Sequence, residues 1–470
     1  MIKQGAALVE VMTEAVETRM AKDATSDGLV RLAQERLRAG AAWLKPMRSA
    51  ALKRFSEIGF PTTKDEEWRF TNVGPIARIA FAFAADNAIR LPAQQIRCFT
   101  FPGLACHQLV FVNGRLAPHL SLISGATLPA GVKIMPLEKA LELDRKLIEP
   151  HFARYPIEQQ DAFTCLNSAF IEDGALIIVP KGVVLDQPIH LLNVATAGDD
   201  GGGGGAPIMT HPRNLIVANR DSQVTVIEHY VSLDDATYLT NAATDVVVGE
   251  NAHVEHYFLE QESPKAFNIS TLRIHQQRDS RSTSHSVLLG GKLVRNNVHT
   301  VLGGEGCDCL INGLYVGSDS QHMDNHMRVE HAQPHGDSRQ FYKGILNDRS
   351  SAVFSGRIIV HPGAQKTDAK QTNKNLLLSE EAHVDTKPQL EIYADDVKCT
   401  HGATIGQLDE EAIFYLRARG LGIDAARSLL IHAFAGESLD RMGIPSIREY
   451  LDKLLLARLP GGTILEQVLG

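Results

Sequence analysis

The chain has 470 residues, of which 44% are hydrophobic and 22% charged, and its formal net charge is −8 at pH 7. This length allows a large core and two or three folded units, and the composition is that of a globular protein. The acidic balance argues against nucleic-acid binding, which needs clustered Lys and Arg to displace counterions.

The chain has no sequence signal for export or membrane insertion. Its longest apolar run, IARIAFAFAADNAI, is interrupted by Arg78 and Asp86 and is shorter than the roughly 18 apolar residues that cross a bilayer. The N-terminal stretch MIKQGAALVEVMTEAVETRM is acidic, unlike a secretory or transit segment. We therefore expect a soluble cytoplasmic protein without membrane contact.

The first predicted element is helical. Apolar residues from about Asp27 to Gly59 recur at helical spacing, and Gly59 is placed to end the helix. A proline turn then leads into FPTTKDEEWRFTN, which we interpret as a docking or boundary segment around a buried Trp68. Residues 1–108 are assigned to an N-terminal helical domain that includes this segment.

From about Leu109 the sequence changes to short alternating runs such as SQVTVIEHYV and VFSGRIIVHPGA, rich in β-branched residues. We expect strands for roughly 250 residues, without the helices of alternating βαβ units. The runs recur roughly every 20 to 25 residues, which favours a β-solenoid, although periodicity alone leaves a β-sandwich open. Residues 109–408 are assigned to this core, with the Gly-rich stretch 198–207 as a flexible loop.

Helical spacing returns after Gly406. Asp409 is placed to cap a short helix that ends at Gly420, and Asp424 begins a second helix. Ser446 and Glu449 have the spacing of a capping box for a third helix. Residues 409–470 are assigned to a small C-terminal helical domain.

Several catalytic and metal motifs are missing from the sequence. It has no GxxxxGK[ST] phosphate loop, no GxSxG elbow, no HExxH and no CxxC pair. We expect neither ATP hydrolysis nor a self-contained zinc or ferredoxin-type site. The six cysteines are too dispersed for a disulfide framework and are expected to be reduced. They are Cys98, Cys106, Cys165, Cys307, Cys309 and Cys399.

Two groups of possible metal ligands are better explained by a structural role than by metal binding. Cys307 and Cys309 share one face of a predicted strand, but cysteine is among the most commonly buried residues, so we favour core packing by about four to one. The run HMDNHMRVEHAQPH contains four histidines without consistent ligand spacing. We favour solvated turns and edges for them by about three to one over a metal site.

Cys399 and His401, in DDVKCTHGATIG, lie two apart and share a face if this stretch is a strand. A thiolate and an imidazole suit iron or zinc, yet a closed tetrahedral site needs four ligands. The stretch is therefore either half of a metal site or a buried cysteine beside a hydrogen-bonded histidine. Residue chemistry alone leaves these two interpretations about even.

Several long segments resemble the SufB/SufD family of the SUF iron-sulfur cluster assembly system. The segments are PTTKDEEWRFTN, YKGILNDRSSAVFSGRIIV, LLIHAFAGE and the run from AQKTDAKQTNKNLLLS to EEAIFYLRARGL. Three details resemble the SufD branch rather than SufB. NKNLLLS stands in place of a CDSMLIG-like cysteine segment, CTHGAT in place of EHEAT, and FYLRARG in place of FYCxQRG.

The resemblance implies a mainly β protein, with a right-handed parallel β-helix core between N-terminal and C-terminal α-helical domains. It implies a non-enzymatic scaffold subunit that pairs with SufB, while the SufC ATPase docks on the C-terminal helical domain. It also implies that a nascent iron-sulfur cluster forms at the SufB interface, with His401 as a ligand and Cys399 as an auxiliary thiol of uncertain role. The residues expected to contact a partner are Phe414, Tyr415, Leu416, Arg417, Arg419, Gly420 and Phe434.

Two rival functions remain at this stage. The first is a self-sufficient homodimeric scaffold paired through a β-helix edge. The second, a fold-level analogy only, is a β-helix enzyme acting on polysaccharide, which the low aromatic content of 6% disfavours. The sequence does not reveal the cluster type, the iron source, the electron donor, or whether a reduced flavin binds the complex.

Overall fold

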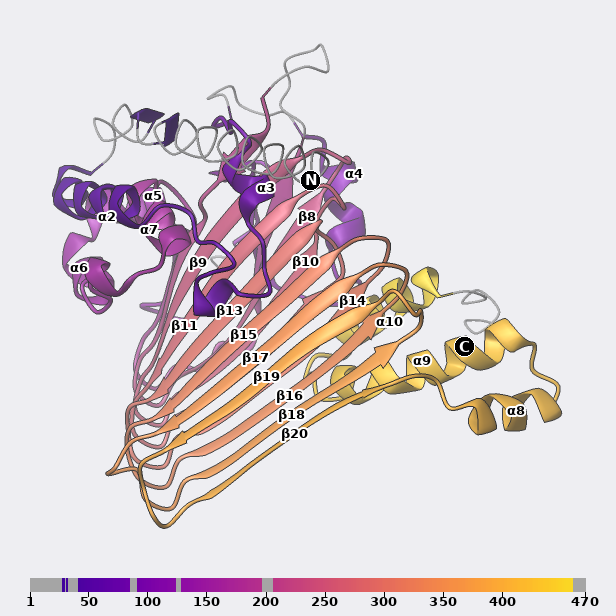
Figure 1. The fold of residues 1–470 in the computed structure, drawn as a ribbon. Coiled ribbons are helices and arrows are strands. Elements are labelled where there is room, and N and C mark those ends of the chain that lie inside the picture. Colours follow the sequence, from indigo (N-terminus) through magenta and orange to yellow (C-terminus); the bar gives the residue numbers. More distant parts are fainter. Residues whose placement is uncertain are drawn as a thin grey trace, which may run out of the picture.

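Two ten-stranded sheets face each other and form a parallel β-solenoid (Figure 1). The computed structural model describes residues 28–29, 31–32, 41–84, 91–123, 128–196 and 206–459. From β7 to β20 consecutive strands alternate between the sheets, so each strand pairs with the strand two places later in the chain. The predicted β-helix core flanked by helices is confirmed, and the sandwich alternative is wrong because the long strands pair in parallel.

The strands of the first sheet are β2 (Arg115–Leu116), β1 (His107–Val112), β5 (Ile189–Ala195), β8 (Gln223–Ser232), β10 (His253–Gln261), β12 (Arg281–Leu288), β14 (Asp308–Gly317), β16 (Asp337–Leu346), β18 (Asp368–Leu377) and β20 (Lys398–Gly406). The strands of the second sheet are β3 (Lys133–Pro136), β4 (Ala175–Val179), β6 (Ile208–Thr210), β7 (Arg213–Ala218), β9 (Tyr238–Val248), β11 (Phe267–Gln276), β13 (Leu293–Leu302), β15 (His322–His331), β17 (Ser351–Val360) and β19 (His383–Ile392).

The coil repeat is longer than the spacing predicted from the sequence. Arg281 pairs with Asp308, 27 residues later, and Asp368 pairs with Lys398, 30 residues later. The loose spacing of strand-like runs was misleading because one coil contains two strands. A corner residue with positive φ precedes each first-sheet strand from β8 to β18 by two positions, and most of these are residue types that tolerate this conformation. They are Asp221, Asn251, Asp279, Gly306, His335 and Lys366.

Helices cover the outer faces of both sheets near the start of the solenoid. They are η1 (Ala42–Leu44), α2 (Lys45–Ile58), η2 (Glu66–Trp68), α3 (Gly74–Ala77), α4 (Ala93–Ile96), η3 (Arg97–Phe99), α5 (Leu137–Leu143), α6 (Arg145–Phe152), η4 (Ile157–Gln159) and α7 (Ala162–Ala169). Gly59 ends α2 with φ 62°, as predicted. The sequence analysis missed α5, α6 and α7, which are short helices that interrupt the expected run of strands.

Three helices follow the last strand: α8 (Glu410–Ala418), α9 (Ile423–Leu439) and α10 (Pro445–Arg458). Asp409 caps α8 by accepting from the N–H of Glu411, as predicted. The predicted capping box on α10 is wrong, because this helix starts at Pro445 and Ile444 is its N-cap. Proline suits the first helical position because its missing N–H would be unpaired there.

The C-terminal helices pack against the flank of the solenoid. Helix α9 lies on β14 and β16, where Asn312 Nδ2 donates to the Ser438 carbonyl over 2.9 Å. Lys343 Nζ donates to the Phe434 carbonyl over 2.6 Å. Apolar side chains of α9 and α10 share a core with outward side chains of the first sheet. These helices therefore cover the outer face of the first sheet, and among the described residues they do not extend over its last strand, β20.

Most of the Gly-rich stretch 198–207 and part of the predicted N-terminal helix lie outside the described residues. The division at residues 108 and 408 stays a prediction, although the strands run from His107 to Gly406. Within the part of the chain that the structure describes, no helix is both long and apolar enough to cross a membrane.

Candidate functional site

In the part of the chain that the structure describes, the solenoid ends in two long strands that each pair with a single strand. β20 pairs with β18, and β19 pairs with β17, and each is the last strand of its sheet. Nearly every residue of β20 is exposed, whereas alternate residues of β18 are buried. Figure 1 shows β20 at the end of the solenoid, opposite the end where the N-terminal helices lie. A strand at the edge of a sheet carries a row of unpaired N–H and C=O groups that can pair with another chain.

Cys399 and His401 lie on this last strand and point into the solenoid. Cys399 continues the register of Ala369 and Ser338 to Cys309, which belongs to the interior core. Register partners on parallel strands leave the same face of the sheet, and residues two apart on one strand share a face. The expectation that the two side chains share a face therefore agrees with the structure.

The two side chains differ in burial. The Cys399 thiol is half-buried, and burial raises its pKa above the usual 9.0, so the thiol is protonated in the isolated chain at neutral pH. His401 is exposed, because no further coil covers it among the described residues. Among the described residues no group of three or more His, Cys, Asp or Glu side chains could hold a metal ion. The last coil supplies at most part of a donor set.

The other cysteines and histidines that were candidate metal ligands have structural roles. Cys307 and Cys309 are buried in the interior core, as favoured from the sequence, and burial raises the pKa of Cys309 to about 12. Three of the four clustered histidines lie on β15 rather than in solvated turns, so the prediction is wrong for these three, whereas His335 does lie at an exposed corner. Among the described residues the three on β15 form no group that could hold a metal ion, and they hydrogen-bond to different partners: His322 with Thr71, His326 with Asp324 and His331 with Ser338.

The predicted partner-binding residues divide into two places. Phe414 and Tyr415 on α8 expose 74% and 56% of their surface, which is unusual for large apolar side chains in a group. The guanidinium of Arg419 lies 4.6 Å from the Tyr415 ring centroid. Gly420 adopts φ 97° directly after the helix, a conformation that glycine tolerates best. Leu416 is partly buried, and Arg417 is exposed like its neighbours on α8.

Phe434 does not belong to the exposed surface of α8. It lies on α9, partly buried against the shared core of the C-terminal helices and the first sheet. The Lys343 ammonium lies 4.1 Å from its ring centroid. The structure therefore gives Phe434 a packing contact within this chain.

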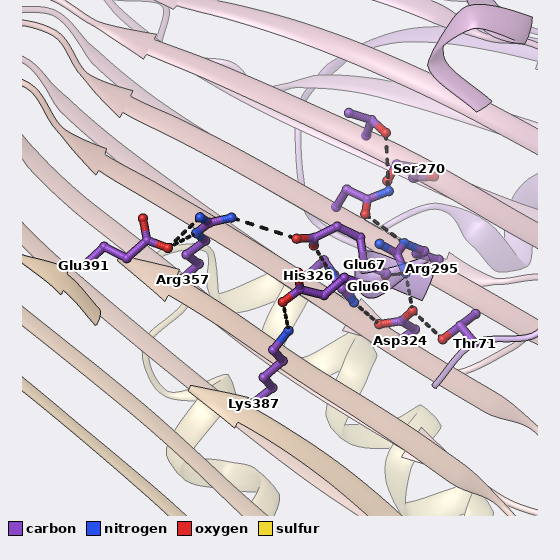
Figure 2. A network of polar contacts seen from close by, with 12 residues as sticks. Glu66, Glu67, Thr71, Ser270, Arg295, Asp324, His326, Arg357, Lys387 and Glu391 are labelled. Carbon is purple, nitrogen blue, oxygen red and sulfur yellow. Dashed lines mark hydrogen bonds and ion pairs between the residues drawn. The ribbon is translucent and has the colours of Figure 1, made fainter. Parts of the chain in front are cut away.

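A polar network that the sequence analysis missed fastens the N-terminal segment to the second sheet (Figure 2). Arg295 lies 3.7 Å from the Trp68 ring centroid and donates to Asp324 over 2.7 Å. Thr71 also donates to Asp324, over 2.5 Å. Arg295 and Asp324 are almost fully buried, and two buried charges are tolerated only when they are paired. The buried Trp68 of the predicted boundary segment is confirmed.

The same segment reaches towards the open end of the solenoid. Glu67 contacts His326 on β15 at 3.4 Å, and Lys387 on β19 donates to Glu66 over 2.8 Å (Figure 2). We call residues 66–71 the strap, because they join strands β13, β15 and β19 of the second sheet. Only the interleaved spacing of acids and aromatics in KDEEWRF hints at this role in the sequence.

A groove of about 700 Å³ lies beside the strap on the outer face of the second sheet. Arg273, Arg328 and Arg357 line it, but each is already paired with a carboxylate, namely Asp245, Glu330 and Glu391 respectively. The positive charges of these arginines are therefore balanced by carboxylates, and the groove is not an anion site.

The comparisons with known proteins agree with this architecture. The family model for the SUF system FeS cluster assembly SufBD core domain matches residues 200–434, and the SufBD protein N-terminal region matches residues 29–191. The chain is 34% identical to the iron-sulfur cluster assembly protein SufD of Escherichia coli over 89% of this chain and 93% of that relative. It is also 34% identical to an iron-sulfur cluster assembly SufBD family protein of Synechocystis, over 87% and 90% respectively.

A SufD protein of Bacillus subtilis is 27% identical over 87% of this chain and 92% of its own length. The fold and its open last coil define a parallel β-solenoid protein with helices on its flanks. The chain belongs to the SufBD family of the SUF iron-sulfur cluster assembly system.

Proposed function

We propose that this chain is a scaffold subunit that builds a nascent iron-sulfur cluster together with a SufB partner. The observation that carries the proposal is the inward position of His401 and Cys399 on an uncovered last strand. Their donor set is incomplete within the described chain, and a second chain that pairs along β20 would bring further donors to the same place. The cluster is the cargo of this site rather than a resident cofactor.

In this proposal His401 is the ligand and Cys399 is an auxiliary thiol. An imidazole binds iron through the lone pair of one neutral ring nitrogen, and an exposed ring on an edge strand is free to meet a partner. Cys399 would need to lose its proton first, and the raised pKa of its half-buried thiol opposes this until a cation is present. Cys399 therefore contributes less than His401 before the partner and iron arrive.

The exposed surface of α8 supports a second contact, with the SufC ATPase. Phe414, Tyr415 and Arg419 form an apolar and cationic patch on the helix that follows the last strand, away from the sheet contacts of α9. ATP hydrolysis belongs to SufC in this proposal, and this chain is not an enzyme. We place the complex in the cytoplasm and keep 1–108, 109–408 and 409–470 as its three domains.

The test is cluster assembly in the reconstituted complex of this chain with SufB and SufC. His401→Ala should abolish cluster loading while the three subunits still assemble. His383→Ala is the matched control, since His383 is an exposed histidine on the other edge strand, and it should load as the parent does. If His401→Ala loads iron and sulfide like the parent, the ligand role is wrong.

The homodimeric scaffold is separated from this proposal by a mixing experiment. Adding SufB to the purified chain should convert any homodimer to a 1:1 complex, measured by light scattering. A homodimer that persists with excess SufB and still loads a cluster would favour the alternative.

A further inference from the structure

One column of interior side chains ends at His401. Ile311, Gln340, Gln371 and His401 are successive register partners on β14, β16, β18 and β20. Ile311 belongs to the interior core, so the whole column points into the solenoid. His401 is therefore the last member of a column whose two preceding members are amides.

These two amides are buried and only half satisfied. Gln340 and Gln371 are 2% and 1% exposed. Nε2 of Gln371 donates to Oε1 of Gln340 over 3.1 Å, which assigns the oxygen and nitrogen ends of both groups. Among the described residues, Oε1 of Gln371 has no hydrogen-bond partner. A buried polar atom without a partner destabilises the folded state, so packing alone does not explain a glutamine here.

The opposite sheet leaves room for the Gln371 amide. Gly356 lies on β17, and a Cβ added there would lie 1.4 Å from Nε2 of Gln371. Glycine within a strand weakens it and marks a place where another group approaches the backbone closely. The second sheet therefore has no side chain opposite Gln371, at a position one coil before the open end.

We propose that Gln371 is the positioning residue for His401. Its free Oε1 accepts the N–H of one ring nitrogen of His401, which leaves the lone pair of the other nitrogen for iron. Metal-binding histidines commonly donate their second ring N–H to such an acceptor, which fixes the tautomer and the ring orientation. The two residues lie on neighbouring strands, about 4.8 Å apart, and leave the same face. This inference rests on the proposed function, since it takes His401 as a ligand.

The test uses three variants of the chain in the complex with SufB and SufC. Gln371→Met keeps the side-chain length but removes the acceptor, and Gln371→Glu retains an acceptor. Asn373→Leu is the matched control, because Asn373 is equally buried on the same face of β18 but is the register partner of Ala403, which has no ring. The measurements are iron affinity and the nitrogen hyperfine coupling of the reduced cluster in pulsed EPR.

Gln371→Met should weaken iron binding about tenfold and change the nitrogen coupling that His401→Ala removes. Gln371→Glu should keep the coupling, and Asn373→Leu should lower thermal stability without altering the spectrum. Parent-like binding and coupling in Gln371→Met would overturn the positioning role while the proposed function stands.

Two further outcomes are decisive. Equal losses in both Gln371 variants would show that Gln371 only packs, because an acceptor does not rescue the site. A nitrogen coupling that survives in His401→Ala would overturn the ligand role of His401, and this inference with it.

Discussion

The two ends of the solenoid are built differently. At the start, the sheets end in β2 and β3, which are two and four residues long and pair antiparallel with their neighbours. Helix α5 also packs against β3 and β4. At the finish, β19 and β20 are ten and nine residues long, and no described strand pairs with their outer edges. Short, covered edges prevent strand addition, and long open edges allow it.

We infer from this difference that stability and the proposed partner binding are separated along the solenoid. The strap and its buried ion pair hold the middle coils, where the outer face of the second sheet is covered. The last coil carries His401 and exposed apolar side chains such as Ile405 and Tyr393. Similar substitutions should therefore affect folding when they are made in the middle coils and assembly with partners when they are made in the last coil.

The largest effect on folding is expected for Asp324→Ala. This change leaves the buried charge of Arg295 without its carboxylate and should reduce the free energy of unfolding by about 3–5 kcal/mol in urea titrations. Asp385→Ala is the control, because Asp385 lies in the same register column on the half-buried last coil and should cost under about 1 kcal/mol. Equal losses in the free energy of unfolding at both positions would contradict the idea that stability depends on the middle coils more than on the last coil.

The next effect is expected at the open edge, for Ala403→Pro. The N–H of Lys398 points towards β18, since it donates to the Thr367 carbonyl, so the N–H of Ala403, an odd number of residues away, points outward. Proline there removes an edge donor without breaking the sheet. Affinity for SufB should fall about tenfold or more in titrations, whereas Ala403→Val should bind normally. Normal binding by Ala403→Pro would rule out strand addition at this edge.

An intermediate effect is expected when acid weakens the strap. The hydrogen bond with His326 lowers the pKa of Glu67 to about 2, against the effect of burial, while the usual value is 4.5. A carboxyl whose pKa is lower in the folded state contributes stability above 4.5 and loses it as the pH falls towards 2.

The measurement is Trp68 fluorescence in a Trp43→Phe chain, where Trp68 is the remaining tryptophan. Its emission should shift to longer wavelength between about pH 4.5 and 2, and Glu67→Gln should weaken the pH dependence. A shift that is unchanged in Glu67→Gln would assign it to other groups.

The smallest effect on folding is expected for Phe414→Ala. This side chain is 74% exposed, so its loss should change the free energy of unfolding by no more than about 0.5 kcal/mol. SufC binding should nevertheless weaken in pull-down and titration experiments. Phe434→Ala is the comparison, since it should lower stability through lost packing. Unchanged SufC affinity in Phe414→Ala would remove α8 from the proposed docking surface.

Much of the fold could be predicted from local patterns. Alternating β-branched runs, the caps at Gly59 and Asp409, and the face shared by Cys399 and His401 depend on neighbours within a few residues. The coil length was harder to predict, because it depends on which strands pair. The phrases RDSQ and RDSR, at the corners before β8 and β12, carried that signal and were not used.

Local patterns in the sequence favoured a β-solenoid over a β-sandwich, and the family resemblance implied the β-helix between helical domains and the two side chains of the candidate site. The three-dimensional pairing of strands was needed to show that, among the described residues, His401 lies on an edge strand beside Gln371 and the C-terminal helices pack on earlier strands of the first sheet. The physical reason is how far apart in the chain the interacting residues lie. Periodicity reports on residues close in the chain, whereas register partners here lie about 30 residues apart, and the strap meets β15 through contacts more than 250 residues apart.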